Sequence, residues 1–120
     1  MPQTYFDSVP VQGAGLGLRR SMLNDCASLT TNDIQFMEVA PENWIGIGGR
    51  YGKAFQAYAE RFPMALHGLS LNIGGPEPLD TDFLSALKKF IDKYQCPFYS
   101  EHLTFCADDG HLYDLSLIHI

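Results

Sequence analysis

Two histidines occupy similar places in two apolar segments, and imidazole is a common metal ligand. His67 lies within residues 64–71 and His102 within residues 98–103. Both segments are too short for helices, and neither alternates apolar with polar residues, which favours strands buried on both faces. One histidine of this kind is more often a core residue bonded to a carbonyl. Two of them at the carboxyl ends of parallel strands, where α/β folds bind ligands, predict a metal site.

Two carboxylates lie in comparable segments. Glu38 follows Phe36 by two residues, so both side chains lie on one face of a strand. A carboxylate inside a sheet is costly unless it is paired or metal-bound, but a strand end that has reached solvent explains Glu38 equally well. Glu101 directly precedes His102, and the alternation along a strand turns it away from the face shared by Ser100 and His102. Imidazole with carboxylate ligands suits iron, manganese or zinc.

The elements that must position these residues alternate along the chain. Four apolar runs predict strands, over residues 13–18, 34–39, 64–71 and 98–103. Apolar residues at helical spacing predict three intervening helices, in the segments 22–29, 55–62 and 83–94. The last helix is expected to begin at the N-cap Asp80 and to end before Pro97, and the middle one to stop at Pro63.

This alternation indicates βαβ units, and therefore an α/β fold with a parallel sheet. A (β/α)8 TIM barrel needs eight units and about 250 residues. The 120 residues of this chain supply about four units. On the pattern alone, a small doubly wound sheet and half of a TIM barrel are equally compatible with the chain.

Composition excludes several classes of function. The net charge of −6 does not suit the neutralisation of phosphates, so nucleic acid is not expected as a partner. No apolar run reaches the roughly 18 residues that span a bilayer, so no membrane association is expected. Residues 1–11 lack the features of a secretion signal. The three cysteines form no C-x-x-C pair, which favours a reducing compartment, the cytoplasm, with each cysteine buried as a small apolar residue.

The glycine-rich segment at residues 13–18 superficially matches a dinucleotide-binding motif. Its spacing is G-x-G-x-G without the final G-x-x-G, and Arg19 and Arg20 follow where a phosphate-binding helix would begin. We therefore expect these glycines to allow close packing of neighbouring elements rather than nucleotide binding.

Taken together, the segments resemble the DUF692 family, also called UPF0276, which comprises multinuclear non-haem iron-dependent oxidative enzymes. The resemblance is carried, in family order and spacing, by GAGLGLR at 13–19, E-x-x-PEN at 38–43, HGLSLNIGG at 67–75, PLD at 78–80, SEHL at 100–103 and LYDL at 112–115. Several linked motifs over nearly the whole chain make a far more specific signal than any one of them.

The resemblance implies a TIM barrel that holds two or three irons. It also implies oxygen-dependent modification of a cysteine-containing precursor peptide, usually presented by a partner protein. By motif, His67 and His102 are implied as iron ligands. Glu101 and Glu38 are implied as catalytic residues, Glu101 by orienting or polarising a ligand. Asn43 is implied as a substrate-binding residue of the pocket.

The resemblance ends near residue 114, where the family continues into the second half of the barrel and the remaining ligands. We therefore expect residues 1–114 to be the N-terminal half of a TIM-barrel domain. Residues 115–120, LSLIHI, are what a common sequencing adapter encodes, so we expect a non-native tail and no ligand role for His119. Two other hypotheses remain. One is a divalent-metal hydrolase or isomerase similar to endonuclease IV and xylose isomerase, and the other is an inactive fragment.

Overall fold

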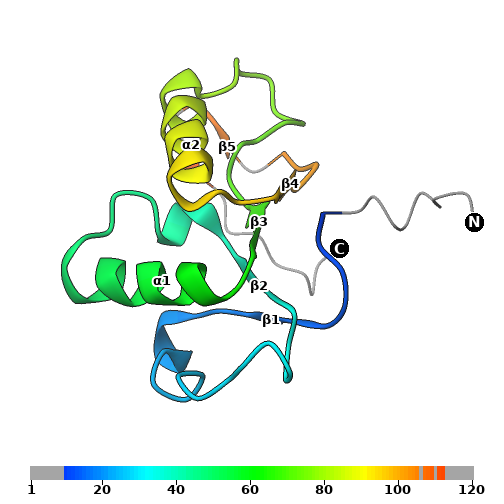
Figure 1. Ribbon diagram of the computed structural model, residues 1–120. Coiled ribbons are helices and arrows are strands. Elements are labelled where there is room, and N and C mark those ends of the chain that lie inside the picture. Colours follow the sequence, from blue (N-terminus) through cyan, green and yellow to red (C-terminus); the bar gives the residue numbers. More distant parts are fainter. Residues whose placement is uncertain (1–9, 106, 110, 113–120) are drawn as a thin grey trace, which may run out of the picture.

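The computed structural model describes residues 10–105, 107–109 and 111–112 (Figure 1). Its elements in chain order are β1 (Gly15–Gly17), the 3₁₀ helix η2 (Arg20–Met22), β2 (Phe36–Val39), the 3₁₀ helix η3 (Pro41–Asn43), α1 (Gly49–Arg61), β3 (Met64–Gly68), α2 (Thr81–Tyr94), β4 (Phe98–Glu101), β5 (Ala107–Asp108) and β6 (His111–Leu112). The four predicted strands are present as β1 to β4, each shorter than the apolar run that predicted it.

The first four strands form one parallel sheet in the order β1-β2-β3-β4. Spatial order therefore follows sequence order. Because the strands are parallel, their carboxyl ends lie at one edge of the sheet. Strands β5 and β6 form a separate antiparallel pair. The predicted α/β fold with a parallel sheet is confirmed for the described residues.

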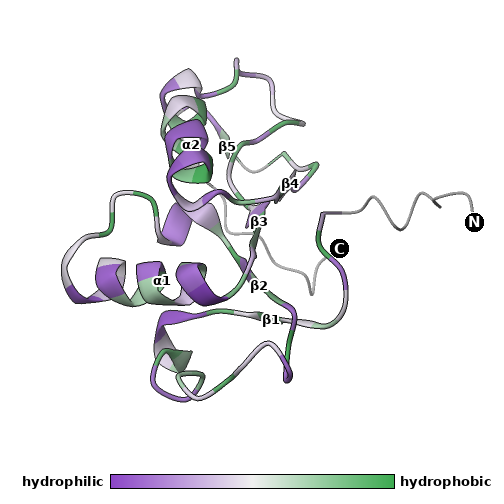
Figure 2. Cartoon of the chain, viewed as in Figure 1, coloured by the Kyte–Doolittle hydropathy of each residue, from purple (hydrophilic) through white to green (hydrophobic). Residues whose placement is uncertain are grey.

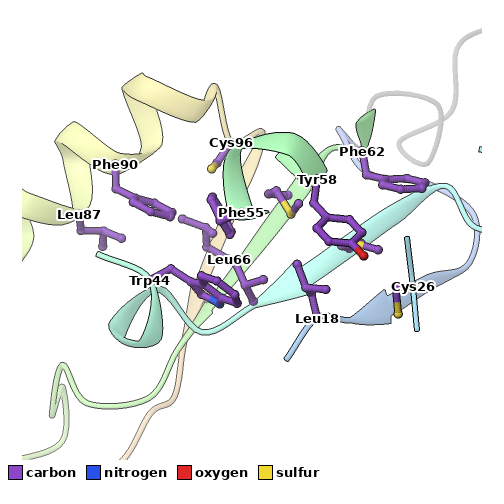
Figure 3. Packing of buried hydrophobic residues seen from close by; sticks show 13 residues of the cluster. Leu18, Cys26, Trp44, Phe55, Tyr58, Phe62, Leu66, Leu87, Phe90 and Cys96 are labelled. Atoms are coloured by element: carbon purple, nitrogen blue, oxygen red, sulfur yellow. The ribbon is translucent and has the colours of Figure 1, made fainter. Parts of the chain in front are cut away.

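One face of the sheet is covered by α1 and α2 (Figures 1 and 3). The side chains that meet there are fully or nearly fully buried: Met37, Val39, Met64 and Leu66 from the strands, Phe55, Tyr58 and Phe62 from α1 and its end, and Leu87 and Phe90 from α2. Phe55 is central to this core. Its ring centroid lies 5.0 Å from that of Trp44, 5.3 Å from that of Phe90 and 4.8 Å from that of Tyr94.

The opposite face, which we call the open face, carries the alternate residues of the same strands. Phe36 and His67 are partly exposed there, Glu38 is exposed, and Phe98 is 43% exposed. The ring of Phe36 lies where a side chain at Gly15 would be, so a Cβ there would clash with it. This contact confirms that the glycine segment allows close packing.

The two α-helices form for the reasons that their sequences predict. Both are amphipathic, and hydrophilic and hydrophobic residues alternate along each in Figure 2. The carboxylate of Asp80 accepts a hydrogen bond from the backbone N–H of Phe83 at 3.0 Å, which confirms the predicted N-cap. Helix α2 ends at Tyr94, and its C-cap Gln95 adopts a left-handed conformation with φ of 52°. No helix in the described ranges is both long and apolar enough to cross a bilayer.

The predicted first helix, over residues 22–29, is wrong. The structure has η2 followed by turns, whose hydrogen bonds mix two spacings: Cys26 N–H donates to Met22 O, but Leu29 N–H donates to Cys26 O. The side chain of Asp33 accepts hydrogen bonds from the N–H and hydroxyl of Thr30, closing the following turn. Short polar side chains that form hydrogen bonds with the backbone compete with helical hydrogen bonds in this way, even where the spacing of apolar residues is that of a helix.

Candidate functional site

The two predicted metal ligands lie side by side. His67 is in β3 and His102 directly follows β4, its parallel neighbour, with His67 registered opposite Ser100. The two imidazole ring centroids are 4.3 Å apart and the ring planes are inclined by 44°. The sequence therefore placed both histidines correctly at one edge of the sheet, where parallel α/β folds bind ligands.

Backbone hydrogen bonds orient His102. Its Nδ1 lies 2.7 Å from the carbonyl oxygen of Gly68, and its own backbone N–H donates to the same oxygen at 3.2 Å. Because a carbonyl oxygen can only accept, Nδ1 must carry the hydrogen. The lone pair of a neutral His102 ring is then on Nε2, which is the form in which imidazole binds a metal.

His67 contacts a hydroxyl instead of a carbonyl. Its Nδ1 lies 2.6 Å from Oγ of Ser100, and that hydroxyl lies 3.4 Å from the carbonyl oxygen of Leu66. Ser100 is absent from the residues for which the sequence predicted a role. The available signal was its position two residues before His102, which puts both on one face of a strand.

Glu101 lies on the other face of β4, as the alternation predicts. Its carboxylate accepts a 2.5 Å hydrogen bond from the hydroxyl of Tyr99 and a 3.2 Å bond from the backbone N–H of His102. It covers Gly68 so closely that a Cβ there would clash with it. The structure thus places Glu101 beside the backbone of His102 and turned away from the open face, and its catalytic role stays a prediction.

Tyr99 is held in its protonated form by this environment. Burial raises the pKa of Tyr99 above its usual range, and the hydrogen bond and charge of Glu101 and the charge of Glu42 raise it further. A tyrosine that keeps its proton remains a hydrogen-bond donor, which fixes the carboxylate of Glu101.

Glu42 is a second residue for which the sequence predicted no role. One carboxylate oxygen accepts hydrogen bonds from the backbone N–H of Leu69 at 2.8 Å, the N–H of Ser70 at 3.1 Å and the hydroxyl of Ser70 at 3.2 Å. Its other oxygen, Oε2, is buried with no hydrogen-bond partner among the described residues. Glu42 thus binds the two residues that directly follow β3, which ends at Gly68, before the predicted residue 71. Glu42 belongs to a recognisable motif, but motif position alone does not reveal this anchor.

A pocket of about 570 Å³ opens beside His67. Glu38 and Asn43, the two predicted pocket residues, both line it, together with Arg19, Arg20 and Trp44. Glu38 is exposed among the described residues, and the choice between a paired or metal-bound carboxylate and a solvent-exposed one stays open.

The rim of this pocket is fixed by Arg20. Its guanidinium donates a 2.6 Å hydrogen bond to the carbonyl oxygen of Asn43 and lies 5.8 Å from the ring centroid of Trp44 and 5.3 Å from that of Tyr51. Both distances are within the range of cation–π attraction, so Arg20 ties the segment after β1 to the segment after β2.

The arrangement offers two of the donors that a metal site would need. Two adjacent imidazoles, one of them with Nδ1 bonded to a carbonyl, fit a pair of metal donors. Within residues 10–105, 107–109 and 111–112, no group of three or more histidine, cysteine or carboxylate side chains could hold a metal ion. A complete site therefore needs donors from elsewhere. Cys26 and Cys96 are free and buried, as predicted, while Cys106 and residues 113–120 lie outside the described residues.

The chain is similar in sequence to known proteins. Residues 13–119 match the model of a family described as RiPP precursor modification enzyme MbnB/TglH/ChrH, where RiPP denotes a ribosomally synthesised and post-translationally modified peptide. The chain is similar to UPF0276 proteins of Pseudomonas aeruginosa (56% identity over 105 residues), Neisseria gonorrhoeae (53% over 106) and Alcanivorax borkumensis (50% over 111). Each match covers 88% of this chain, and the chain spans only 37–38% of the length of these relatives.

Proposed function

Because the chain belongs to the MbnB/TglH/ChrH family, also called DUF692 or UPF0276, we propose that it is part of an enzyme that oxidatively modifies a RiPP precursor peptide. The proposed substrate is a cysteine-containing peptide, delivered by a peptide-presenting partner protein, and the proposed oxidant is O₂. The single observation that carries this proposal is the pair of adjacent imidazoles of His67 and His102 at the carboxyl edge of the sheet.

Iron is the proposed metal, with His67 and His102 among its ligands. A non-haem iron centre, when bound, supplies redox chemistry with O₂ and affinity for a thiolate. The described residues hold the two imidazoles in place through the strands and through the Gly68 carbonyl. Two or three irons would need further carboxylate, amide or imidazole donors from other segments.

The pocket beside His67 is the proposed place for the substrate. Glu38 and Asn43 line it and are available to contact a peptide, as the family motif implies. Glu101 acts indirectly in this proposal. Its carboxylate accepts a hydrogen bond from the backbone N–H of His102 and so orients that residue from the face opposite the open face.

A TIM barrel is the proposed fold of the domain to which residues 1–114 contribute. Two observations support it over a doubly wound sheet. Among the described residues, strand order follows sequence order without the reversal that doubly wound sheets contain, and the helices there cover one face of the sheet. In a barrel the open face, with Phe36, His67 and Phe98, becomes the interior.

Turnover by the intact protein, meaning this chain with any sequence that follows it in the gene, tests the proposal. Iron-loaded enzyme should consume O₂ and change the mass of a cysteine-containing precursor peptide encoded nearby. His67→Ala and His102→Ala should each abolish this, and Glu101→Gln should lower it without changing the thermal midpoint. Gln56→Ala, at an exposed residue of α1, serves as the matched control. Activity with zinc or manganese and no O₂ consumption would instead support the hydrolase or isomerase hypothesis.

A further inference from the structure

The hydroxyl of Ser100 is the closest polar contact of the His67 ring. The two residues are opposed in the register of β3 and β4, which brings Oγ to within 2.6 Å of Nδ1. A hydroxyl can either donate to Nδ1 or accept from it. This contact therefore decides which ring nitrogen of His67 carries the hydrogen, and with it which nitrogen can bind a metal.

The two arrangements have opposite consequences. If Ser100 donates to Nδ1, the hydrogen of a neutral His67 is on Nε2, and neither nitrogen has a free lone pair. If Nδ1–H donates to Ser100, the lone pair of Nε2 is free. Only the second arrangement leaves His67 able to act as a metal ligand without breaking its hydrogen bond.

Two observations favour the second arrangement. The hydroxyl of Ser100 has another acceptor for its hydrogen, the carbonyl oxygen of Leu66 at 3.4 Å. His102, two residues after Ser100 and directly after β4, has its Nδ1 bonded to the Gly68 carbonyl and is therefore fixed as the Nδ1–H form. Two carbonyl groups of β3 thus act as acceptors in the same way. The Leu66 carbonyl accepts from the hydroxyl of Ser100, and the Gly68 carbonyl, two residues later, accepts from Nδ1 of His102.

We infer that Ser100 is a positioning residue that fixes His67 as the Nδ1–H tautomer by passing its hydrogen bond on to the Leu66 carbonyl. In this state His67 and His102 present the same ring nitrogen, Nε2, as donor. The functional consequence of this inference rests on the proposed function, because the tautomer of His67 matters only if His67 binds a metal. The tautomer itself is a property of the metal-free protein and can be measured there.

The test compares wild type, Ser100→Ala and Ser100→Thr in the intact protein labelled with ¹⁵N-histidine. Long-range ¹H–¹⁵N correlation spectra of the metal-free protein distinguish the two tautomers for each ring. Wild type and Ser100→Thr should show Nδ1–H for His67, as for His102, whereas Ser100→Ala should shift His67 toward Nε2–H. Ser85→Ala, at an exposed residue of α2, is the matched serine control and should leave the His67 signals unchanged.

Anaerobic calorimetric titration with Fe²⁺ alone gives the second measurement. Ser100→Ala should weaken Fe²⁺ binding by about 10–100-fold, and Ser100→Thr should restore most of it. An Nε2–H signal for His67 in wild type, or an unchanged tautomer in Ser100→Ala, would overturn the inference. If the tautomer responds as expected but His67→Ala binds Fe²⁺ as tightly as wild type, the inference on Ser100 stands and the proposed metal site fails.

Discussion

The two faces of one parallel sheet differ in chemistry, although the same strands build both. On the covered face, Met37 and Leu66 are fully buried beneath α1 and α2. On the open face, the alternate residues include Glu38 and His67, both at least partly exposed. The covered face obtains its stability from packing within the described residues, whereas the open face carries groups that suit ligand binding. In this chain, stability and chemistry are therefore separated by the alternation of side chains along each strand.

The largest expected effect concerns the open face as a whole. Residues 1–114 expressed alone should not form a stable monomer, because β1 and β4 are edge strands and the proposed barrel interior has no covering half. Losing several large contacts at about 1.5–3 kcal/mol each would exhaust a stability margin of about 5–15 kcal/mol. Size-exclusion chromatography and a denaturant melt measure this. A sharp monomer peak with a cooperative transition would support a complete doubly wound domain.

Truncation of Phe55, at the centre of the covered face, should lower stability less than this, but more than the other single substitutions considered below. Phe55 is 1% exposed and contacts three aromatic rings, so Phe55→Ala should lower the free energy of unfolding of the intact protein by about 3–5 kcal/mol. Phe105→Ala, at a residue that is 53% exposed, is the matched control and should cost far less. Equal losses in urea melts would mean that the core is not where the structure places it.

The sequence predicted the covered face well and the open face in part. Helical spacing identified Phe55 and Phe90 because periodicity records burial directly. The rule that parallel strands bind ligands at their carboxyl ends was sufficient to pair His67 with His102. In both cases a regular pattern, either the helical spacing or the alternation of strands and helices, indicates where a residue lies in the fold.

Specific hydrogen bonds could not be predicted in this way. The contact of Ser100 with His67 depends on the register of β3 and β4, which no local pattern specifies. The hydrogen bonds that Glu42 accepts from Leu69 and Ser70 depend on how η3 meets the segment after β3. The prediction of a helix over residues 22–29 was wrong for a related reason. Apolar spacing carries no information on side-chain hydrogen bonds such as those between Thr30 and Asp33, which close the following turn.

A smaller effect is expected in the segment that follows β3 at the carboxyl edge of the sheet. Glu42→Ala would leave the backbone N–H groups of Leu69 and Ser70 without their acceptor and should cost about 1–3 kcal/mol. Hydrogen exchange at these two amides should accelerate. Glu42→Gln keeps one carbonyl oxygen and should retain most of their protection. Identical exchange in Glu42→Ala and wild type would show that this anchor does not hold the loop.

The smallest expected effect is chemical. Burial raises the pKa of the Cys96 thiol to about 11 from 9.0, so the native thiol should react slowly with iodoacetamide at pH 8. Because the folded state holds this proton more tightly, its contribution to stability is present below pH 9 and is lost as the pH rises toward 11. Peptide mapping of native and denatured samples measures the labelling. Equal labelling of Cys96 in both would contradict its burial.

Iron content of the intact protein tests the central claim most directly, since the open face is proposed to hold metal through His67 and His102. Wild type and the core variant Phe55→Leu, purified anaerobically with Fe²⁺, should contain the same number of irons per chain. His67→Ala, His102→Ala and the double variant should each contain fewer, with altered Mössbauer spectra. Unchanged stoichiometry and unchanged spectra in all three histidine variants would contradict the account.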